Sequence, residues 1–481
     1  MIGQLGTLLM TFRDVFPRAA TFHWFVVAAF GFIVRLDHHG VSSNIRWLKV
    51  RPDLYETFLA FFRSEALKIN NVLKHWQLLV AKRYAVRTQS GALVLIGDGI
   101  KAAKEAMFMP GVKKLHQESE NSGKAAWIYG HHFGVVGILA GITQKFFCIP
   151  LAAELHEGTA VLRKLQGKKP PKVNGVEKTT VITLMGKLLT TVAGNINEPC
   201  VAGLDAFFAS APIFAIAKAS AEATGKQMLH IITRAKGNIV AYGLQPAAYC
   251  GRGRPPKHGQ KFQLKELFSS RINDFVNVTI NVYGETKTLS ILCLDLMWKP
   301  FQGILRFVLV KDGEQTFILI CSDLTMAAEE IISLYARRFK IEVTFKMLKH
   351  ILGGFCYHFW TKAWQVPNGE TLLLEQLTKM PKKTQRLIAD AMNAVEAFVN
   401  LAMIATGLLQ LLAVEHAQEI QKSHCWWMRT YSSEVPSEEM VKTVIQHEFY
   451  HNFRKFKHTA IYRIIQNKRL QPEAIPLRKA A

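Results

Sequence analysis

Two short apolar runs in the sequence each end in an aspartate. Residues 92–98 have the sequence ALVLIGD, and residues 201–205 have the sequence VAGLD. Apolar runs of this length are typical of strands that are buried inside a sheet. Open α/β sheets place their ligand-binding groups at the carboxyl ends of such strands. We therefore expect an α/β fold in which Asp98 and Asp205 lie at one edge of a buried sheet.

A third acidic residue belongs to a helical pattern. Residues 332–352 contain no Pro or Gly and carry apolar residues at helical spacing, which predicts one amphipathic helix. A helix turns every ~3.6 residues, so side chains three, four and seven residues apart share roughly one face. The residues that follow this spacing are Tyr335, Arg338, Glu342 and Lys349. A solvated polar face with helical ion pairs is the alternative interpretation of the same spacing.

The charge of the chain indicates a polyanionic partner. Of its 481 residues, 60 are Lys or Arg and 36 are Asp or Glu, which gives a net charge of +24. Nucleic acid is the usual partner of so basic a chain, and an anionic membrane surface is the alternative. The apolar run at residues 22–34 is shorter than the ~20 residues that a membrane-spanning helix needs. We therefore predict a buried helix there and no membrane association.

The seven cysteines occur singly along the sequence, with no CxxC pair. This pattern argues against a zinc site and a disulfide framework, and it fits a reducing cytosol. The acidic residues, by contrast, suggest metal binding, because carboxylate oxygens are the ligands that hard divalent cations prefer. Two Mg²⁺ ions held by three carboxylates can activate a water or a hydroxyl for attack on a phosphodiester.

Each acidic residue also has a structural interpretation. Asp98 precedes Gly99 and is compatible with a turn, whereas Asp205 is compatible with a helix N-cap. Asp323 is a rival third acid, and we expect it to cap the helix that follows. Near the N-terminus, residues 39–51 have the size of a helix-turn-helix unit and carry three basic residues, although ordinary helix packing explains them equally well. These three are Arg46, Lys49 and Arg51.

Three stretches of the sequence resemble the DDE transposases of bacterial insertion sequences. Residues 96–124 resemble the first-Asp block of that family, and residues 201–210 are similar to its second-Asp block. The third stretch matches the Y-R-E-K signature in residue type and spacing at Tyr335, Arg338, Glu342 and Lys349. The resemblance implies an RNase H-like catalytic core with a β-rich insertion, in a chain that is α+β overall.

The resemblance also implies a division of the chain. The terminal domains are helical, and the N-terminal one is a candidate for DNA binding. The expected segments are the N-terminal domain (1–88), the first part of the catalytic core (89–235), the β-rich insertion (236–324), the second part of the core with the signature helix (325–400) and the C-terminal domain (401–481). Within them, residues 158–178 are rich in Lys, Gly and Pro and suggest a long exposed loop.

The family resemblance assigns roles to single residues. Asp98, Asp205 and Glu342 would be catalytic and would bind Mg²⁺ or Mn²⁺, as two ions. Tyr335, Arg338 and Lys349 would hold DNA phosphates near the cleaved end. Trp298 would stack on an unpaired base, and a core tryptophan is the alternative.

Residues 252–255 have the sequence RGRP, which resembles a minor-groove hook. In such a hook proline stiffens an extended basic strand, so Arg252 and Arg254 would contact DNA. A solvated basic turn is the alternative interpretation.

Together these features predict a transposase that cuts the ends of its own mobile element and joins them to target DNA by two-metal phosphoryl transfer. Its partners would be double-stranded DNA, both element ends and target, and a second copy of the chain on paired ends. Its location would be the cytoplasm, at the nucleoid. The alternatives are another RNase H-like DNA nuclease without strand transfer, or a basic DNA-binding protein without catalysis.

Overall fold

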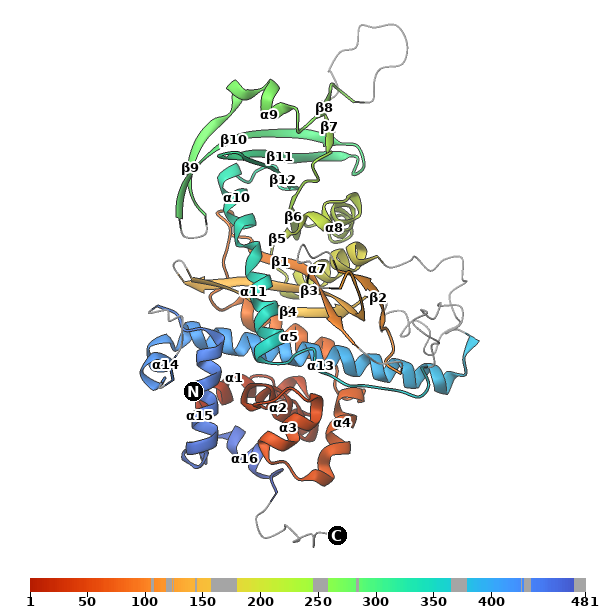
Figure 1. Cartoon of the computed structure of the whole chain (residues 1–481), viewed down its shortest axis with the longest axis vertical. Coiled ribbons are helices and arrows are strands. Elements are labelled where there is room, and N and C mark those ends of the chain that lie inside the picture. The colour runs from red at the N-terminus through yellow and green to blue at the C-terminus, as the bar shows by residue number, and fades with distance from the viewer. Residues whose placement is uncertain are drawn as a thin grey trace.

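The computed structural model describes residues 1–104, 108–117, 123, 125–142, 145–156, 180–244, 258–282, 285–364, 379–424, 426–427 and 434–470. Figure 1 shows an elongated molecule in which a long sheet lies above the helix α13 (Lys382–Glu415), and most of the other N- and C-terminal helices lie below it. The described strands form one 12-stranded mixed sheet. The mixed α/β class expected from the sequence is therefore confirmed.

The middle of the sheet contains the two strands that the apolar runs predicted. β1 runs parallel to β5 on one side and antiparallel to β3 on the other. β5 in turn runs parallel to β6, while β2 and β4 both pair with β3. The bounds are β1 (Leu93–Ala103), β2 (Lys113–His116), β3 (Trp127–Ile142), β4 (Lys145–Leu155), β5 (Cys200–Leu204) and β6 (Leu229–Arg234).

The segment 236–324 is rich in strands, as predicted, and its strands continue the same sheet. β12 pairs antiparallel with β6 and then with β11, which pairs with β10. This connection was not foreseen, because the strand content of a segment does not identify the neighbours of its strands. The bounds are β7 (Val240–Tyr242), β8 (Lys261–Gln263), β9 (Val276–Val282), β10 (Glu285–Trp298), β11 (Gly303–Asp312) and β12 (Gln315–Cys321). A short helix, α9 (Leu267–Ser270), interrupts them.

Helices pack on both faces of β1. A Cβ atom at Gly97 would lie 2.7 Å from the sulfur of Met185, so glycine is needed where α7 (Val181–Ile196) approaches the strand. Side chains alternate between the two faces of a strand. Asp98 therefore projects away from α7, toward the segment that contains α10 (Ala328–Ala336) and α11 (Lys340–Lys346). The next helix in the chain is α8 (Ala211–Thr224).

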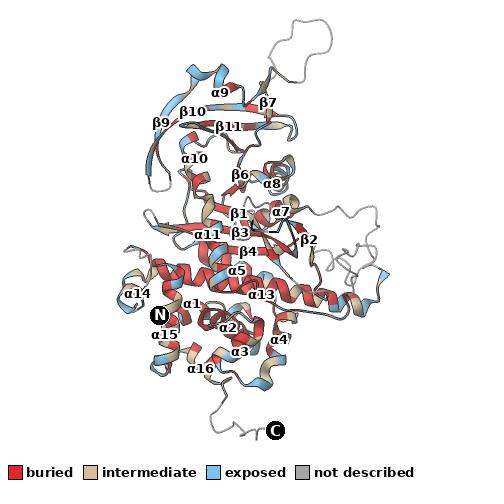
Figure 2. Cartoon of the chain, in the orientation of Figure 1, coloured by how far each residue is buried: buried red, intermediate tan, exposed pale blue. Residues whose placement is uncertain are grey.

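The helical N- and C-terminal regions form one group. The ammonium of Met1 lies 2.8 Å from Glu448, and residues 22–34, apart from the half-buried His23, are buried inside the group, as predicted for an apolar helix too short to span a membrane. Figure 2 shows that buried residues continue along α13. The bounds are α1 (Ile2–Met10), α2 (Ala19–Val34), α3 (Gly40–Leu48), α4 (Tyr55–Arg63), α5 (Ile69–Ala81), α14 (Ala417–Ser423), α15 (Glu438–Asn452) and α16 (Ala460–Gln466).

Helix α13 is the one described helix that is long and apolar enough to cross a membrane by length and composition alone. Its most apolar window is entirely buried inside the protein. A core helix of a soluble protein passes the same test, so α13 gives only weak evidence for a membrane span.

Some local predictions were wrong. β1 does not end at Asp98 but continues to Ala103, because β3 pairs with it throughout that length. Residues 113–116 form β2, a strand that was not predicted from the sequence. The expected loop at 158–178 lies outside the described residues, as do Arg252 and Arg254.

Candidate functional site

Asp98 and Asp205 lie side by side because of the register of two parallel strands. The pairing of β1 with β5 runs from Leu93 opposite Cys200 to Gly97 opposite Leu204. Asp98 and Asp205 are the next residues on each strand, at the point where the parallel pairing ends. The expected location is thus correct for Asp205, which follows the end of β5. Asp98 was also expected at the end of a strand, but only the parallel pairing of β1 with β5 ends next to it, and β1 itself continues to Ala103.

The sequence predicted one continuous helix over residues 332–352, but the structure shows that this segment is interrupted. A tight turn at Arg337–Phe339 separates α10 from α11, and a widened turn at Met347–Ile351 follows α11. Arg338 and Glu342 nevertheless keep the distance of one helical turn, and Nη2 of Arg338 donates to Oε1 of Glu342 at 2.9 Å.

The central feature of the site is one guanidinium that faces three carboxylates. Besides Glu342, Arg338 lies 3.4 Å from Oδ2 of Asp98 and 3.9 Å from Oδ1 of Asp205. We call these three acids the acid cluster. Their segments are far apart in the chain, and they meet because β1 and β5 are neighbours while the α10–α11 segment crosses the sheet near the point where their parallel pairing ends (Figure 1).

The burial of the four side chains is graded. Arg338 is 15% exposed and Asp98 is 20% exposed, whereas Asp205 is 43% and Glu342 is 56% exposed. The cluster therefore opens to solvent on the side of Asp205 and Glu342, and Asp98 forms its floor.

The acid cluster holds more negative charge than Arg338 neutralises. The pKa of Asp98 is raised to about 6, mainly by burial and to a smaller extent by the carboxylates of Asp205 and Glu342, while the N–H of Gly99 and the charge of Arg338 oppose the rise. Burial alone would lower the pKa of Arg338, but the neighbouring carboxylates, Asp98 first, hold it above its ordinary value. One positive and three negative groups leave an excess that a further cation would balance.

The other two signature residues take different positions. Tyr335 is partly buried, and its ring centroid lies 6.0 Å from the guanidinium carbon of Arg338. Lys349 lies in the widened turn, is exposed and has no hydrogen bond or ion pair to any described residue. Its ammonium is thus available to a ligand from solvent, although it does not join the acid cluster.

Trp298 stands at the end of β10, where it is 8% exposed and packs edge-on against Phe214 with ring centroids 5.8 Å apart. It borders a hollow of about 310 Å³ whose lining includes Lys236 and Lys299. The packing agrees with the core alternative, whereas the basic lining agrees with the proposed contact to a nucleic acid.

Two structural interpretations of the acids are resolved by hydrogen bonds. The side chain of Asp205 makes no cap bond to the short helical turn that follows it, so capping does not explain this residue. Asp323 accepts hydrogen bonds from the backbone and hydroxyl of Thr325 and therefore closes a turn. The helix begins only at Ala328, so the expected helix cap at Asp323 was wrong.

Among the described residues, no three His, Cys, Asp or Glu side chains are placed closely enough to hold a metal ion as they stand. The acid cluster still fits a divalent metal in its chemistry, because it offers only carboxylate oxygens and carries excess negative charge. Its three members already approach one cation, the guanidinium of Arg338. Their side chains would have to close in where that guanidinium now lies.

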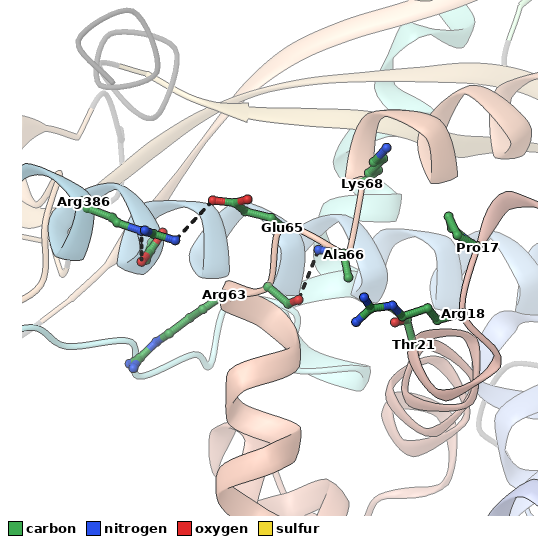
Figure 3. Close-up of a pocket in the computed structure, with 10 residues that line it drawn as sticks. Pro17, Arg18, Thr21, Arg63, Glu65, Ala66, Lys68 and Arg386 are labelled. Carbon is green, nitrogen blue, oxygen red and sulfur yellow. Dashed lines mark hydrogen bonds and ion pairs between the residues drawn. The ribbon is translucent and has the colours of Figure 1, made fainter. Parts of the chain in front are cut away.

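A second charged hollow was not foreseen from the sequence. It measures about 550 Å³ and lies among the α1–α2 connection, the α4–α5 connection and α13 (Figure 3). Its lining carries four cations, of which Arg386 is paired with Glu65 at 3.3 Å and with Asp390 at 4.0 Å. The other three are Arg18, Arg63 and Lys68. Because these cations come from distant segments, no local pattern announces the hollow.

No protein-family model matches this sequence, and no curated protein matches it. The assignment of a function therefore rests on the sequence motifs and on the geometry of the acid cluster.

Proposed function

We propose that this protein is a metal-dependent DNA transposase with an RNase H-like catalytic core. The observation that carries the proposal is the meeting of three carboxylates from β1, β5 and α11 around Arg338. The order and spacing of these residues are those of the Y-R-E-K family that the sequence resembles. The basic charge of the chain, +24, suits a DNA substrate.

The centre of the sheet is compatible with an RNase H-like core. Antiparallel strands β4, β3 and β1 lie beside the parallel strands β5 and β6, and helices pack on both faces of β1. The strands β7 to β12 would then be the insertion, although they extend the same sheet. Their position between Asp205 and Glu342 in the chain agrees with the order of blocks in the family.

In this proposal the acid cluster would hold Mg²⁺ or Mn²⁺, which when bound would supply a polarised nucleophile and neutralise charge at the scissile phosphate. Asp98 would provide the ligand from the floor of the site, and Asp205 and Glu342 would close it from the solvent side. Nearby, Tyr335 and Lys349 would contact the DNA backbone.

Arg338 has two successive roles in this scheme. In the protein alone, its guanidinium neutralises part of the charge of the acid cluster. When DNA is bound, a phosphate offers the same planar fork a new bidentate partner. Arg338 would then move from the carboxylates to the phosphate and leave the carboxylates free for cations. Substrate binding and completion of the metal site would thus be coupled through one side chain.

One observation favours a second candidate function. Arg338 is paired with all three acids, as in a structural ion-pair network, and such a network would suit a basic DNA-binding protein without catalysis. A network built for stability would be expected to balance its charges. The excess of two negative charges is therefore the reason for preferring the catalytic proposal.

The test is metal-dependent cleavage of duplexes that carry the DNA flanking the coding sequence. Glu342→Gln should lower the rate of cleavage and of strand transfer by several orders of magnitude, because one site performs both steps. Binding of the duplex in a gel shift should persist. Asp98→Asn and Asp205→Asn should behave alike, and double variants should be little worse than single ones.

The matched control is Glu329→Gln, which removes an exposed acid from the first turn of α10 outside the cluster. This variant should cut at the wild-type rate. Near wild-type cleavage by the Glu342 variant would exclude the three-carboxylate mechanism, and cleavage without strand transfer by the unaltered protein would favour the nuclease alternative.

A further inference from the structure

An exposed group of aromatic and basic side chains lies on the hairpin formed by β2 and β3. It consists of Lys114 and His116 on β2 and of Trp127 and Tyr129 on β3, and we call it the aromatic platform. Trp127 is 53% exposed and Tyr129 is 48% exposed, although large aromatic side chains are usually buried. The acid cluster does not use any of these residues.

The register of the hairpin brings these four side chains together on one face. His116 lies directly opposite Trp127, and Lys114 lies directly opposite Tyr129. The rings of His116 and Trp127 are 4.9 Å apart between centroids, and the amine of Lys114 lies 5.0 Å from the Trp127 centroid. Leu115, which alternates with them on β2, is buried on the other face.

The aromatic platform lies on the same face of the sheet as Asp98. Asp98 is directly opposite Val135 on β3, and residues directly opposite each other point to the same face. Trp127 and Tyr129 precede Val135 by eight and six residues, and even steps along a strand return to the same face. At ~3.4 Å per residue, Trp127 lies roughly 27 Å from Val135 along the strand.

The chemistry of the aromatic platform matches a nucleobase that is not paired in a duplex. Exposed rings offer a stacking surface to any base, and a neighbouring ammonium attracts the phosphates on either side. Paired bases are already stacked on their neighbours, so this surface favours unpaired ones.

We infer that the aromatic platform binds an unpaired stretch of the same DNA that the acid cluster holds. The inference rests on the proposed function, because it takes the acid cluster as the point of cleavage. DNA rises ~3.4 Å per base step, so a distance of roughly 27 Å corresponds to about eight steps. The platform would thus hold single-stranded DNA about eight nucleotides from the cleaved phosphate.

The experiment compares two fluorescent DNAs with the full-length chain at one salt concentration. One is a fully paired duplex, and the other is the same duplex with an unpaired run of thymidines about eight steps from its end. Trp127→Ala should weaken binding of the second DNA by roughly 5- to 100-fold, the range found when a stacked aromatic is removed. Binding of the fully paired duplex should change less than about twofold.

Three further variants distinguish stacking from a general loss of structure. Trp127→Leu keeps apolar bulk but removes the ring face, so it should lose as much affinity as Trp127→Ala. Tyr129→Phe keeps the ring and should bind both DNAs normally. Trp427→Ala removes a tryptophan that is 87% exposed elsewhere on the surface, and it should also bind both DNAs normally.

Equal weakening for both DNAs, or none for either, would overturn the inference. So would a change of oligomeric state without a change in DNA affinity, because the platform would then contact a second copy of the chain. The proposed function is tested separately, by cleavage with Asp98→Asn. If Asp98→Asn still cleaved DNA, the proposed function would be wrong, but the measured DNA affinities of the platform variants would remain valid. If the platform variants bound both DNAs normally, the inference would be wrong, but the cleavage result would remain valid.

Discussion

Arg35 and Arg338 are both enclosed by protein, but they are surrounded by opposite kinds of partner. Arg35 is fully buried, and its guanidinium donates to the backbone carbonyls of Gly40 at 3.0 Å and of Gly353 at 3.0 Å. It also donates to the carbonyl of Leu352 and lies 4.6 Å from the ring centroid of Phe32. Arg338 makes its contacts with the three carboxylates of the acid cluster.

The difference separates a structural arginine, Arg35, from Arg338, for which we propose a functional role. The acceptors of Arg35 are neutral and fixed by the backbone, and burial lowers its pKa to about 10. Its hydrogen bonds join the start of α3 to Leu352 and Gly353, at the end of the segment that carries the signature residues. The acceptors of Arg338 are charged, carried by side chains and too many for one cation. The first environment holds a single arrangement, whereas the second can exchange one cation for another.

The largest expected effect on stability is that of Arg35→Ala. Its loss removes three hydrogen bonds to buried carbonyls, of which that of Gly353 keeps a second donor, the N–H of Cys356, and the expected cost is roughly 3–5 kcal/mol in total. Urea unfolding followed by circular dichroism should show a clearly lower midpoint than that of the wild-type protein. Arg35→Lys keeps the charge but not the planar fork, and it should recover only part of the loss. A change below about 1 kcal/mol for Arg35→Ala would remove the contrast between the two arginines.

The second largest expected effect is a gain in stability rather than a loss. Asp98→Asn should stabilise the protein at pH 7.5, because the pKa of Asp98 is raised from 3.8 to about 6 in the folded state. Between these values the folded state binds more protons than the unfolded state, so stability falls as pH rises through this window. The penalty amounts to about 3 kcal/mol at most above pH 6, at 1.36 kcal/mol per pKa unit.

Thermal unfolding in EDTA measures this effect. The variant should melt at a higher temperature than the wild-type protein at pH 7.5, and the difference should shrink at pH 4.5. A structural ion-pair network predicts the reverse, since removing one partner of a stabilising pair lowers stability. A lower melting temperature of Asp98→Asn at pH 7.5 would therefore support the non-catalytic alternative.

The smallest effect is on metal affinity. Arg338→Ala removes the cation that now faces the acid cluster, so Mn²⁺ should bind more tightly by about tenfold, or ~1.4 kcal/mol. Isothermal titration calorimetry without DNA measures this directly. Arg337→Ala is the matched control, because its guanidinium lies 4.3 Å from the ring of Phe146 and outside the acid cluster. Weaker Mn²⁺ binding by the Arg338 variant would contradict the exchange of cations at this site.

Local sequence was sufficient for much of the architecture. Apolar runs located β1 and β5, and the absence of helix breakers located the signature segment, because such patterns depend only on neighbouring residues. The family resemblance also implied a β-rich segment at 236–324, in which the strands between residues 276 and 321 lie. The acids were found because their types and spacings suggested the same chemistry, even though each alone had a structural explanation.

Tertiary structure decided the features that depend on partners distant in the chain. β1 continues past Asp98 because β3 pairs with it there, and the tight turn at Arg337–Phe339 directs Arg338 toward acids more than 100 residues away in sequence. The rings of Trp127 and His116 meet edge-on only because the β2–β3 register sets the two residues opposite each other. Short-range periodicity is encoded in consecutive residues, whereas strand register and the convergence of charges arise only when separate elements pack. The sequence by itself therefore specified the components of this site, and the fold specified their arrangement.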